Sequence, residues 1–358
     1  MNRKNGTFYT GKPTDHSSPY FVWLCAVLHR STGKDWYRDL AIAKGGEIID
    51  AFPQMTKTPT ALGLSGSIVG TTLFELTKKK EYLDFMEKCA RTVVRDHGRW
   101  TQDGNHFYMT QNFIGYPRVS CILSSLYRTG SVLWQTVRYR GKFKKELASM
   151  AKFYLDRLSQ IEIGRDPEFF RPEKRLSAAD TTERAFENRL GFRRNSTDFR
   201  ERFLSADFAK TVFAARNIAR VITDGSIDFK PAYDSLLNLG KKHRWTIPFD
   251  TVDEGLRFNN TGYGVRQDIG GTAWSLLAFA TLDDSDQIDK ENPSRCLAQK
   301  LLAPQVASTT HNIFLGVPQL AINGLRDVHT SVDTDAVGLH ALLATSGRKD
   351  ILDGIDFI

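Results

Sequence analysis

The stretch Leu73-Phe-Glu-Leu-Thr-Lys-Lys-Lys-Glu-Tyr-Leu-Asp-Phe85 decides the fold, because it joins an apolar segment to a charged one across a run of lysines. Beyond the lysines, Tyr82, Phe85 and Met86 recur at steps of three and four with charged residues between them, as on one face of an amphipathic helix. The preceding segment, Leu62-Gly-Leu-Ser-Gly-Ser-Ile-Val-Gly70, is apolar on all sides, which is typical of a helix buried on most faces. The sequence therefore predicts a hairpin of one buried and one amphipathic helix.

The same helix pair recurs along the chain. Residues 26–40 turn at Thr32-Gly33-Lys34 and residues 342–352 turn at Ser346-Gly347, while weaker copies turn near positions 130, 224 and 284. The turns are spaced by roughly 45–65 residues, except between 130 and 224, and such a period indicates a repeat architecture. Strand signals are few, with short hairpins expected around 98–108 and 245–265.

This alternation of buried and amphipathic helices resembles the (α/α)n toroid of glycoside hydrolases, polysaccharide lyases, lanthionine cyclases and class II terpene cyclases. The resemblance implies an all-α fold, an (α/α)5–6 toroid of repeated helical hairpins with few or no strands. We expect one toroid domain over residues 1–358, with a charged insertion at about 164–203. An open solenoid of helix pairs is the alternative, because such arrays repeat in the same way.

Composition limits the class of protein and its partners. The chain has 358 residues, of which 41% are hydrophobic, so collagen-like, disulfide-scaffold and wholly disordered proteins are excluded. Lys and Arg number 49 against 41 Asp and Glu, which gives a net charge of +8 and suits an anionic partner. Segment 164–203 is dense in both charges without a sustained apolar stripe, which predicts a solvated insertion or, alternatively, an arm that binds an anion through residues such as Arg193 and Arg194.

The cysteines and the N-terminus favour a cytoplasmic location. Cys25, Cys89, Cys121 and Cys296 lie far apart in apolar helical runs, so we expect buried free thiols and a reducing compartment. The N-terminal residues lack the apolar core of a secretory signal, and the apolar stretch 20–28 is too short to span a membrane. No phosphate-binding loop, dinucleotide fingerprint or zinc-spaced cluster is present, so we expect neither a cofactor nor a metal.

Three polar stretches precede expected inner helices, where a toroid opens at one end. The first, residues 99–112, is dense in polar and aromatic side chains, and Asp103-Gly104 within it also predicts a plain turn. His106 is a candidate acid or base. Candidate substrate-binding residues are Trp100, Tyr108 and Asn112.

The second stretch, residues 257–268, holds the residue types that uronate chemistry needs. β-Elimination requires donors that neutralise the sugar carboxylate, a base at C5 and an acid at the leaving oxygen. Asn259, Asn260 and Arg266 are candidate donors and Tyr263 a candidate acid or base. The paired asparagines resemble the Asn-Asn-His loop of toroidal alginate lyases, although Thr261 stands where that family has His.

The third stretch, residues 328–342, contains Asp333 at an expected helix start. It resembles the Asp-rich helix start of class II terpene cyclases, with Asp333 as the alkene-protonating acid, although Ser331 and Thr334 replace the flanking carboxylates. Unsaturated glucuronyl hydrolases also place an Asp beside Thr or Ser at such a helix start. A helix cap made by Ser331, Asp333 and Asp335 is the structural alternative.

These features lead to three functional hypotheses. The first is a carbohydrate-active enzyme, a lyase or hydrolase, whose substrate is an anionic small molecule or oligosaccharide containing uronate. The aromatic content of 11% provides rings that could stack on sugars. The second is a terpene-cyclase-like enzyme, and the third a non-catalytic helical binding or scaffold protein. Residues 127–145 mix basic and aromatic side chains as a nucleic-acid surface does, but an outer toroid helix explains them better, so we expect no nucleic-acid partner. A polar centre would favour sugar, a dry aromatic centre with one acid would favour terpene, and a filled centre would favour a scaffold.

Overall fold

The protein is described by a computed structural model. It describes residues 12–14, 18–109, 125–159, 205–242, 266–280, 306–307, 315–316, 320–322, 325–326 and 332–345. The charged insertion at 164–203 and the turns expected near 284 and 347 lie outside these residues. None of the described helices is long and apolar enough to cross a membrane.

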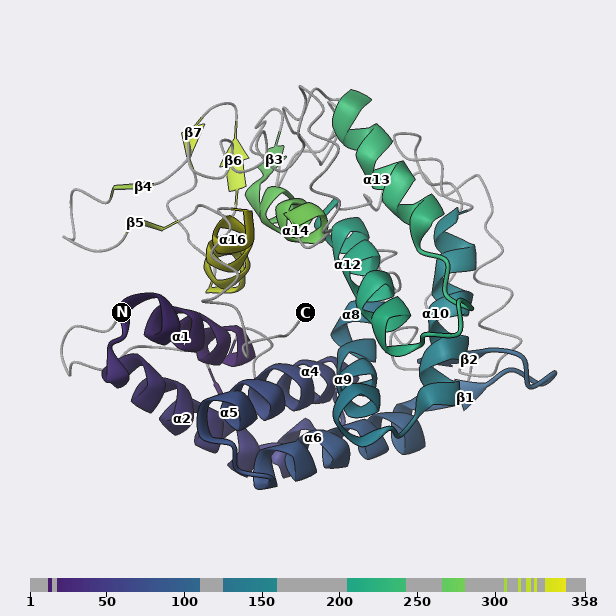
Figure 1. Ribbon diagram of the computed structural model, residues 1–358, viewed down its shortest axis with the longest axis horizontal. Coiled ribbons are helices and arrows are strands. Elements are labelled where there is room, and N and C mark those ends of the chain that lie inside the picture. Colours follow the sequence, from purple (N-terminus) through teal and green to yellow (C-terminus); the bar gives the residue numbers. More distant parts are fainter. Residues whose placement is uncertain are drawn as a thin grey trace, which may run out of the picture.

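Two layers of helices form the architecture (Figure 1). The inner layer consists of α1 (Ser18–Thr32), the continuous run α4 (Pro59–Leu64), η1 (Ser65–Val69) and α5 (Gly70–Thr77), the pair α8 (Ser125–Arg128) and α9 (Gly130–Arg140), α12 (Ser205–Val221), α14 (Ile269–Ala280) and α16 (Val332–Thr345). The outer layer consists of α2 (Asp35–Asp50), α6 (Glu81–Thr92), α10 (Lys144–Ser159) and α13 (Lys230–Lys242). The short elements α3 (Phe52–Met55) and η2 (Val93–His97) belong to the connections.

The inner helices close into a ring. Each packs on the next, from α1 to η1, α4 to α8, α8 to α12, α12 to α14 and α14 to α16, and α16 packs back on α1 (Figure 1). At this junction Trp23 Nε1 donates a hydrogen bond of 3.2 Å to Nδ1 of His340, and both side chains are fully buried. The expected all-α toroid is therefore confirmed, and the open solenoid is excluded because the first and last inner helices touch.

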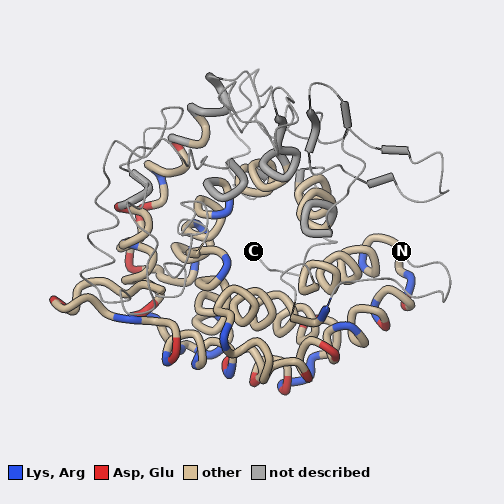
Figure 2. The backbone as a smooth tube through the Cα atoms, turned by 180° about the vertical axis from the view of Figure 1, so that it is seen from behind, with Lys and Arg blue, Asp and Glu red and all other residues tan. Residues whose placement is uncertain are grey.

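Helix polarity follows the two layers. The α6 side chains Phe85, Met86 and Cys89 are buried, as the amphipathic pattern predicts, and Figure 2 shows charges gathered along the outer helices. Cys25 and Cys89, the two described cysteines, are buried free thiols, as expected.

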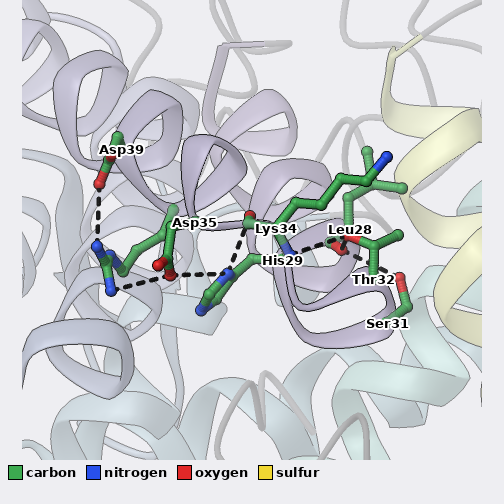
Figure 3. A network of polar contacts seen from close by, with 8 residues as sticks. Leu28, His29, Ser31, Thr32, Lys34, Asp35 and Asp39 are labelled. Atoms are coloured by element: carbon green, nitrogen blue, oxygen red, sulfur yellow. Dashed lines mark hydrogen bonds and ion pairs between the residues drawn. The ribbon is translucent and has the colours of Figure 1, made fainter.

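The first helical hairpin turns through a local polar network (Figure 3). The hydroxyl of Thr32 donates to the Leu28 carbonyl at 2.6 Å and accepts from the Lys34 amide at 3.4 Å, while Gly33 adopts a φ of +69°. The ring of His29 lies 3.2 Å from the Lys34 carbonyl oxygen. This polar cluster, in which Arg38 also bridges Asp35 and Asp39, holds the turn together.

One predicted turn is misplaced. The turn expected at Thr129-Gly130 is only a break within the inner helix, because the Thr129 amide and hydroxyl both donate to the Ser125 carbonyl, at 2.9 and 2.7 Å. The chain reverses instead at Gly141, whose φ is +68°, before α10. Residues 127–140 therefore belong to an inner helix and not to the expected outer one, and only its end carries the exposed Arg138.

Small sheets occupy the connections between helices. The strands β1 (Gly98–Trp100) and β2 (Phe107–Met109) pair antiparallel, which confirms the hairpin expected at 98–108. The strand β3 (Arg266–Asp268) pairs with β6 (Leu320–Ile322), which in turn pairs with β7 (Leu325–Arg326). A further pair joins β4 (Val306–Ala307) and β5 (Leu315–Gly316). The hairpin expected around 245–265 lies outside the described residues.

Candidate active site

Aromatic side chains from alternate inner helices meet at the centre of the ring. The hydroxyl of Tyr20, on α1, donates to that of Tyr127, on α8, at 3.1 Å, and the Tyr127 ring packs edge-on against Trp274 of α14 at 4.6 Å. Phe213, on α12, lies 5.9 Å from Trp274. Because α1, α8 and α14 are not neighbours in the ring, these side chains reach one another only across its centre.

This aromatic cluster, Tyr20, Tyr127, Phe213 and Trp274, lies near one end of the ring. Tyr20 is in the first turn of α1, and Trp274 is in the second turn of α14. All four rings are buried, so side chains fill the centre of the ring at this level. A filled ring centre is compatible with a non-catalytic scaffold. The buried rings would equally form the floor of a site that opens at the end of the ring where the inner helices begin.

A cation accompanies the cluster. Lys210, in the second turn of α12, places Nζ 5.2 Å from the centroid of the Trp274 ring and is only 9% exposed. An ammonium over an indole face is a favourable cation–π contact, and more so where water is excluded. The centre of the ring is thus aromatic but not purely apolar.

Two of the polar stretches expected at the mouth lead into neighbouring inner helices, α14 and α16. Arg266 begins β3, which leads directly into α14, and β3 pairs with β6, the strand shortly before α16. Asp333 is the second residue of α16, and α16 packs on α14. Arg266 thus lies in the strand before α14 and Asp333 at the start of α16, and α14 and α16 are neighbours in the ring (Figure 1). Asn259, Asn260 and Tyr263 precede this strand and lie outside the described residues.

The first polar stretch lies elsewhere. The β1–β2 hairpin packs against the outer helix α10 and projects from the outer edge of the ring (Figure 1). The ring of His106 lies 5.6 Å from that of Phe153 on α10, Tyr108 is buried at 2% exposure, and Trp100 stacks under the Lys145 ammonium at 4.8 Å. These three residues are therefore not at the mouth where we expected them, because their hairpin docks on the outer layer. Asn112 lies outside the described residues.

The polar density of this hairpin has a local explanation. Asp103 accepts hydrogen bonds from the Thr101 hydroxyl and from the Asn105 amide and side chain, and these bonds lower the pKa of Asp103 to about 2. Gly104 follows with a φ of +71°. The plain turn predicted by Asp103-Gly104 accounts for the cluster without a ligand.

The sequence reasoning missed the aromatic cluster and Lys210. Tyr20 lies in an apolar run, and Lys210 lies in a helix that also carries Asp207, Arg216 and Arg220, so its charge does not stand out. Among the described residues, no cluster of His, Cys, Asp and Glu could hold a metal ion.

The chain has the fold of several solved carbohydrate-active enzymes. An unsaturated glucuronyl hydrolase from Bacillus sp. GL1, described as responsible for glycosaminoglycan degradation, is 12% identical and aligns with a TM-score of 0.61 over 93% of this chain and 86% of its own. A heparin-specific unsaturated glucuronyl hydrolase is 13% identical, with a TM-score of 0.61 over 94% and 87%. Cellobiose 2-epimerase from Bacillus thermoamylovorans is 10% identical, with a TM-score of 0.56 over 97% and 94%. No protein-family model and no curated protein sequence matches the chain.

Proposed function

We propose that this protein is a cytoplasmic carbohydrate-active enzyme, a hydrolase or lyase, acting on an acidic saccharide that contains uronate. The observation that carries the proposal is that Arg266 begins the strand leading into α14 and Asp333 lies at the start of α16, and that these two inner helices pack on each other. A guanidinium and a carboxylate from neighbouring helix starts are the donor and the acid that cleavage of a uronate requires.

Each residue has a distinct role in the proposed chemistry. Arg266, with Asn259 and Asn260, neutralises the substrate carboxylate. In a hydrolase Asp333 donates a proton to the glycosidic oxygen as its bond to the anomeric carbon breaks, and water adds to that carbon. In a lyase the C5 proton is removed, the C4=C5 double bond forms as the C4–O bond breaks, and the leaving oxygen is protonated; Tyr263 takes the C5 proton or supplies the proton to the leaving oxygen. His106 takes no part in this chemistry, because its hairpin docks on the outer helix α10.

The structural neighbours support the choice of substrate. One neighbour with this fold, a glucuronyl hydrolase variant from Streptococcus agalactiae, is described in complex with dGlcA-GalNAc6S, a uronate-containing disaccharide. The net charge of +8 of the present chain is compatible with such an anionic substrate.

The ring centre argues against the terpene-cyclase alternative. A terpene cyclase uses exposed aromatic faces to stabilise a migrating carbocation, which requires the surrounding groups to be neutral or negative. The Lys210 ammonium occupies the face of Trp274 and would repel such a cation.

A panel of uronate polymers and their unsaturated oligosaccharides tests the proposal. New ultraviolet absorbance would identify a lyase. Loss of ultraviolet absorbance from the unsaturated substrates, together with new reducing ends, would identify a hydrolase. In the hydrolase, Asp333→Asn should lower kcat about 10²-fold or more, whereas Asp335→Asn, two residues further on the same helix, should leave it within about threefold. Absence of turnover on every uronate substrate by the folded wild-type protein would refute the proposal and favour the scaffold.

A further inference from the structure

We propose that Trp36 and Tyr37, at the start of the outer helix α2, form a surface site for neutral sugars, separate from the proposed active site. The aromatic pair stacks on the pyranose ring of a β-linked glucose unit, and the charged side chains beside it bind the hydroxyl groups of that sugar. The inference goes beyond the proposed function and does not depend on it, because it concerns binding at another part of the surface.

Trp36 is exposed where the helix does not need an aromatic side chain. The solvent-facing side of α2 follows steps of three and four through Trp36, Asp39, Ala43, Glu47 and Asp50, all of them exposed. The last four are charged or small, as is usual for a face in water. Trp36 is 46% exposed, and no other large hydrophobic side chain is exposed in the part of the chain that the structure describes. Its apolar surface is therefore available to a partner.

Tyr37 completes a flat aromatic platform. The rings of Trp36 and Tyr37 stack with their centroids 3.8 Å apart and their planes inclined by 27°. Tyr37 covers one face of the indole, so the opposite face and the ring edge supply the exposed surface. An indole held by a stacked neighbour has less freedom to lose on binding, and the pair is thus preorganised for a flat apolar surface such as a sugar ring.

Charged side chains in the same turn of the helix supply hydrogen-bond donors and acceptors. The Arg38 guanidinium lies 3.2 Å from Asp35 Oδ1 through Nη1 and 3.3 Å from Asp39 Oδ1 through Nη2. The two carboxylates are 66% and 67% exposed, so the lone pairs that Arg38 does not use are open to sugar hydroxyls. The turn therefore offers a pyranose both an apolar surface for its C–H groups and ionised groups for its hydroxyls.

The local charge selects a neutral sugar. Over residues 34–39, the positive charges of Lys34 and Arg38 are balanced by two aspartates. Exposed carboxylates beside the platform would repel the carboxylate of a uronate. A β-linked glucose unit has no charge, carries C–H groups on both faces of its ring and has its hydroxyls around the rim, so it matches both parts of the surface.

The platform lies at the other end of α1 from the proposed active site. Tyr20, in the first turn of α1, belongs to the aromatic cluster, whereas Trp36 follows the last residue of α1 by four positions. The 15 residues of α1 span about 22 Å at 1.5 Å per residue. A sugar bound at Trp36 therefore does not compete with a substrate where the inner helices begin.

Cellotetraose, a β-1,4-linked oligomer of glucose, is the probe for the first test. In nuclear magnetic resonance spectra of the isotope-labelled protein, the indole N–H signal of Trp36 is the one that is missing from Trp36→Ala. Cellotetraose should shift this signal saturably in the wild type, and the matching tetramer of glucuronate should bind there about threefold or more weakly. A Trp36 signal that does not move at about 10 mM cellotetraose, tenfold above a millimolar Kd, would overturn the inference.

Substitution of Trp36 is the second test. Trp36→Ala should lower the affinity for cellotetraose about tenfold or more, and Trp36→Phe should retain part of it because a smaller ring still stacks. The matched control is Asp50→Ala, on the same exposed face at the other end of α2, which should leave the affinity within about twofold. Equal affinities in Trp36→Ala and Asp50→Ala would contradict the assignment of the site to Trp36.

Two further measurements separate the inference from its alternatives. Sedimentation equilibrium that shows a dimer lost in Trp36→Ala, together with a Trp36 signal that ignores cellotetraose, would assign the platform to a second copy of this chain and overturn the sugar site. Trp36→Ala should leave kcat and KM for a small uronate substrate unchanged. If the wild-type protein cleaves no uronate substrate but its Trp36 signal responds to cellotetraose, the surface site stands and the proposed function fails.

Discussion

The contact between the second and third inner helices depends on Gly63. A Cβ atom at this position would lie 2.0 Å from the Arg128 carbonyl oxygen and 2.7 Å from the Thr129 Cα, both backbone atoms. Ordinary contact begins at 3.4 Å, so α4 and α8 would have to separate by more than 1 Å. One turn further on, the Ser67 and Ser131 hydroxyls share a hydrogen bond of 2.8 Å that such a separation would break.

We therefore expect Gly63→Ala to destabilise the protein. Overpacking costs about 1–3 kcal/mol, and loss of a buried hydrogen bond about 1 kcal/mol more. The better helix propensity of Ala returns about 1 kcal/mol, so the free energy of unfolding should fall by about 1–3 kcal/mol. Urea unfolding followed by circular dichroism measures this as a lower midpoint at an unchanged slope.

Gly46→Ala is the matched control. Gly46 lies within the outer helix α2, and a Cβ atom there would meet nothing within 4 Å. Its substitution should therefore stabilise the protein by up to about 1 kcal/mol. If Gly63→Ala is as stable as Gly46→Ala, the two inner helices are not in the backbone contact described above, and the reasoning is wrong.

Two further predictions concern buried polar side chains. Burial lowers the pKa of His340 from 6.5 to about 3, so below pH 6.5 the unfolded chain binds a proton that the folded protein does not, and stability falls with pH. As the pH falls from about 7 to 5, protonation of the unfolded chain at His340 should lower the free energy of unfolding by about 2 kcal/mol. His340→Asn should remove this dependence on pH. If urea unfolding gives the wild type and His340→Asn the same pH dependence of stability, the prediction is contradicted. Gln135 is fully buried, and neither Oε1 nor Nε2 of its side-chain amide has a hydrogen-bond partner in the described structure. Gln135→Met should therefore raise the free energy of unfolding by about 1 kcal/mol. A lower free energy of unfolding in this variant would show that the amide is paired.

Helix periodicity was enough to predict the ring but not all of its turns. The apolar and amphipathic segments around Gly66 and Phe85 became an inner and an outer helix, because burial on all sides or on one side follows from side-chain spacing alone. The turn predicted at Thr129-Gly130 was wrong, although both residue types favour turns. The Thr129 hydroxyl donates to the Ser125 carbonyl one turn back, and the helix continues. Turn signals are local, and the packing of α8 between α4 and α12 overrides them.

The candidate site was harder to predict because its parts meet through tertiary structure. The density of polar residues singled out both 99–112 and 257–268, yet it could not distinguish a hairpin that satisfies its own hydrogen bonds, as Asp103 does, from a loop at the mouth. Nor can spacing reveal that Tyr20 and Tyr127, 107 positions apart, touch across the ring.

The helix starts that carry Arg266 and Asp333 and the aromatic cluster at the ring centre differ in how strongly their residues affect stability. Arg266 and Asp333 lie before and at the starts of two neighbouring inner helices, where residues can vary with little effect on the packing between those helices. The cluster around Lys210 and Trp274 holds four inner helices together at the centre, so each of its side chains affects stability.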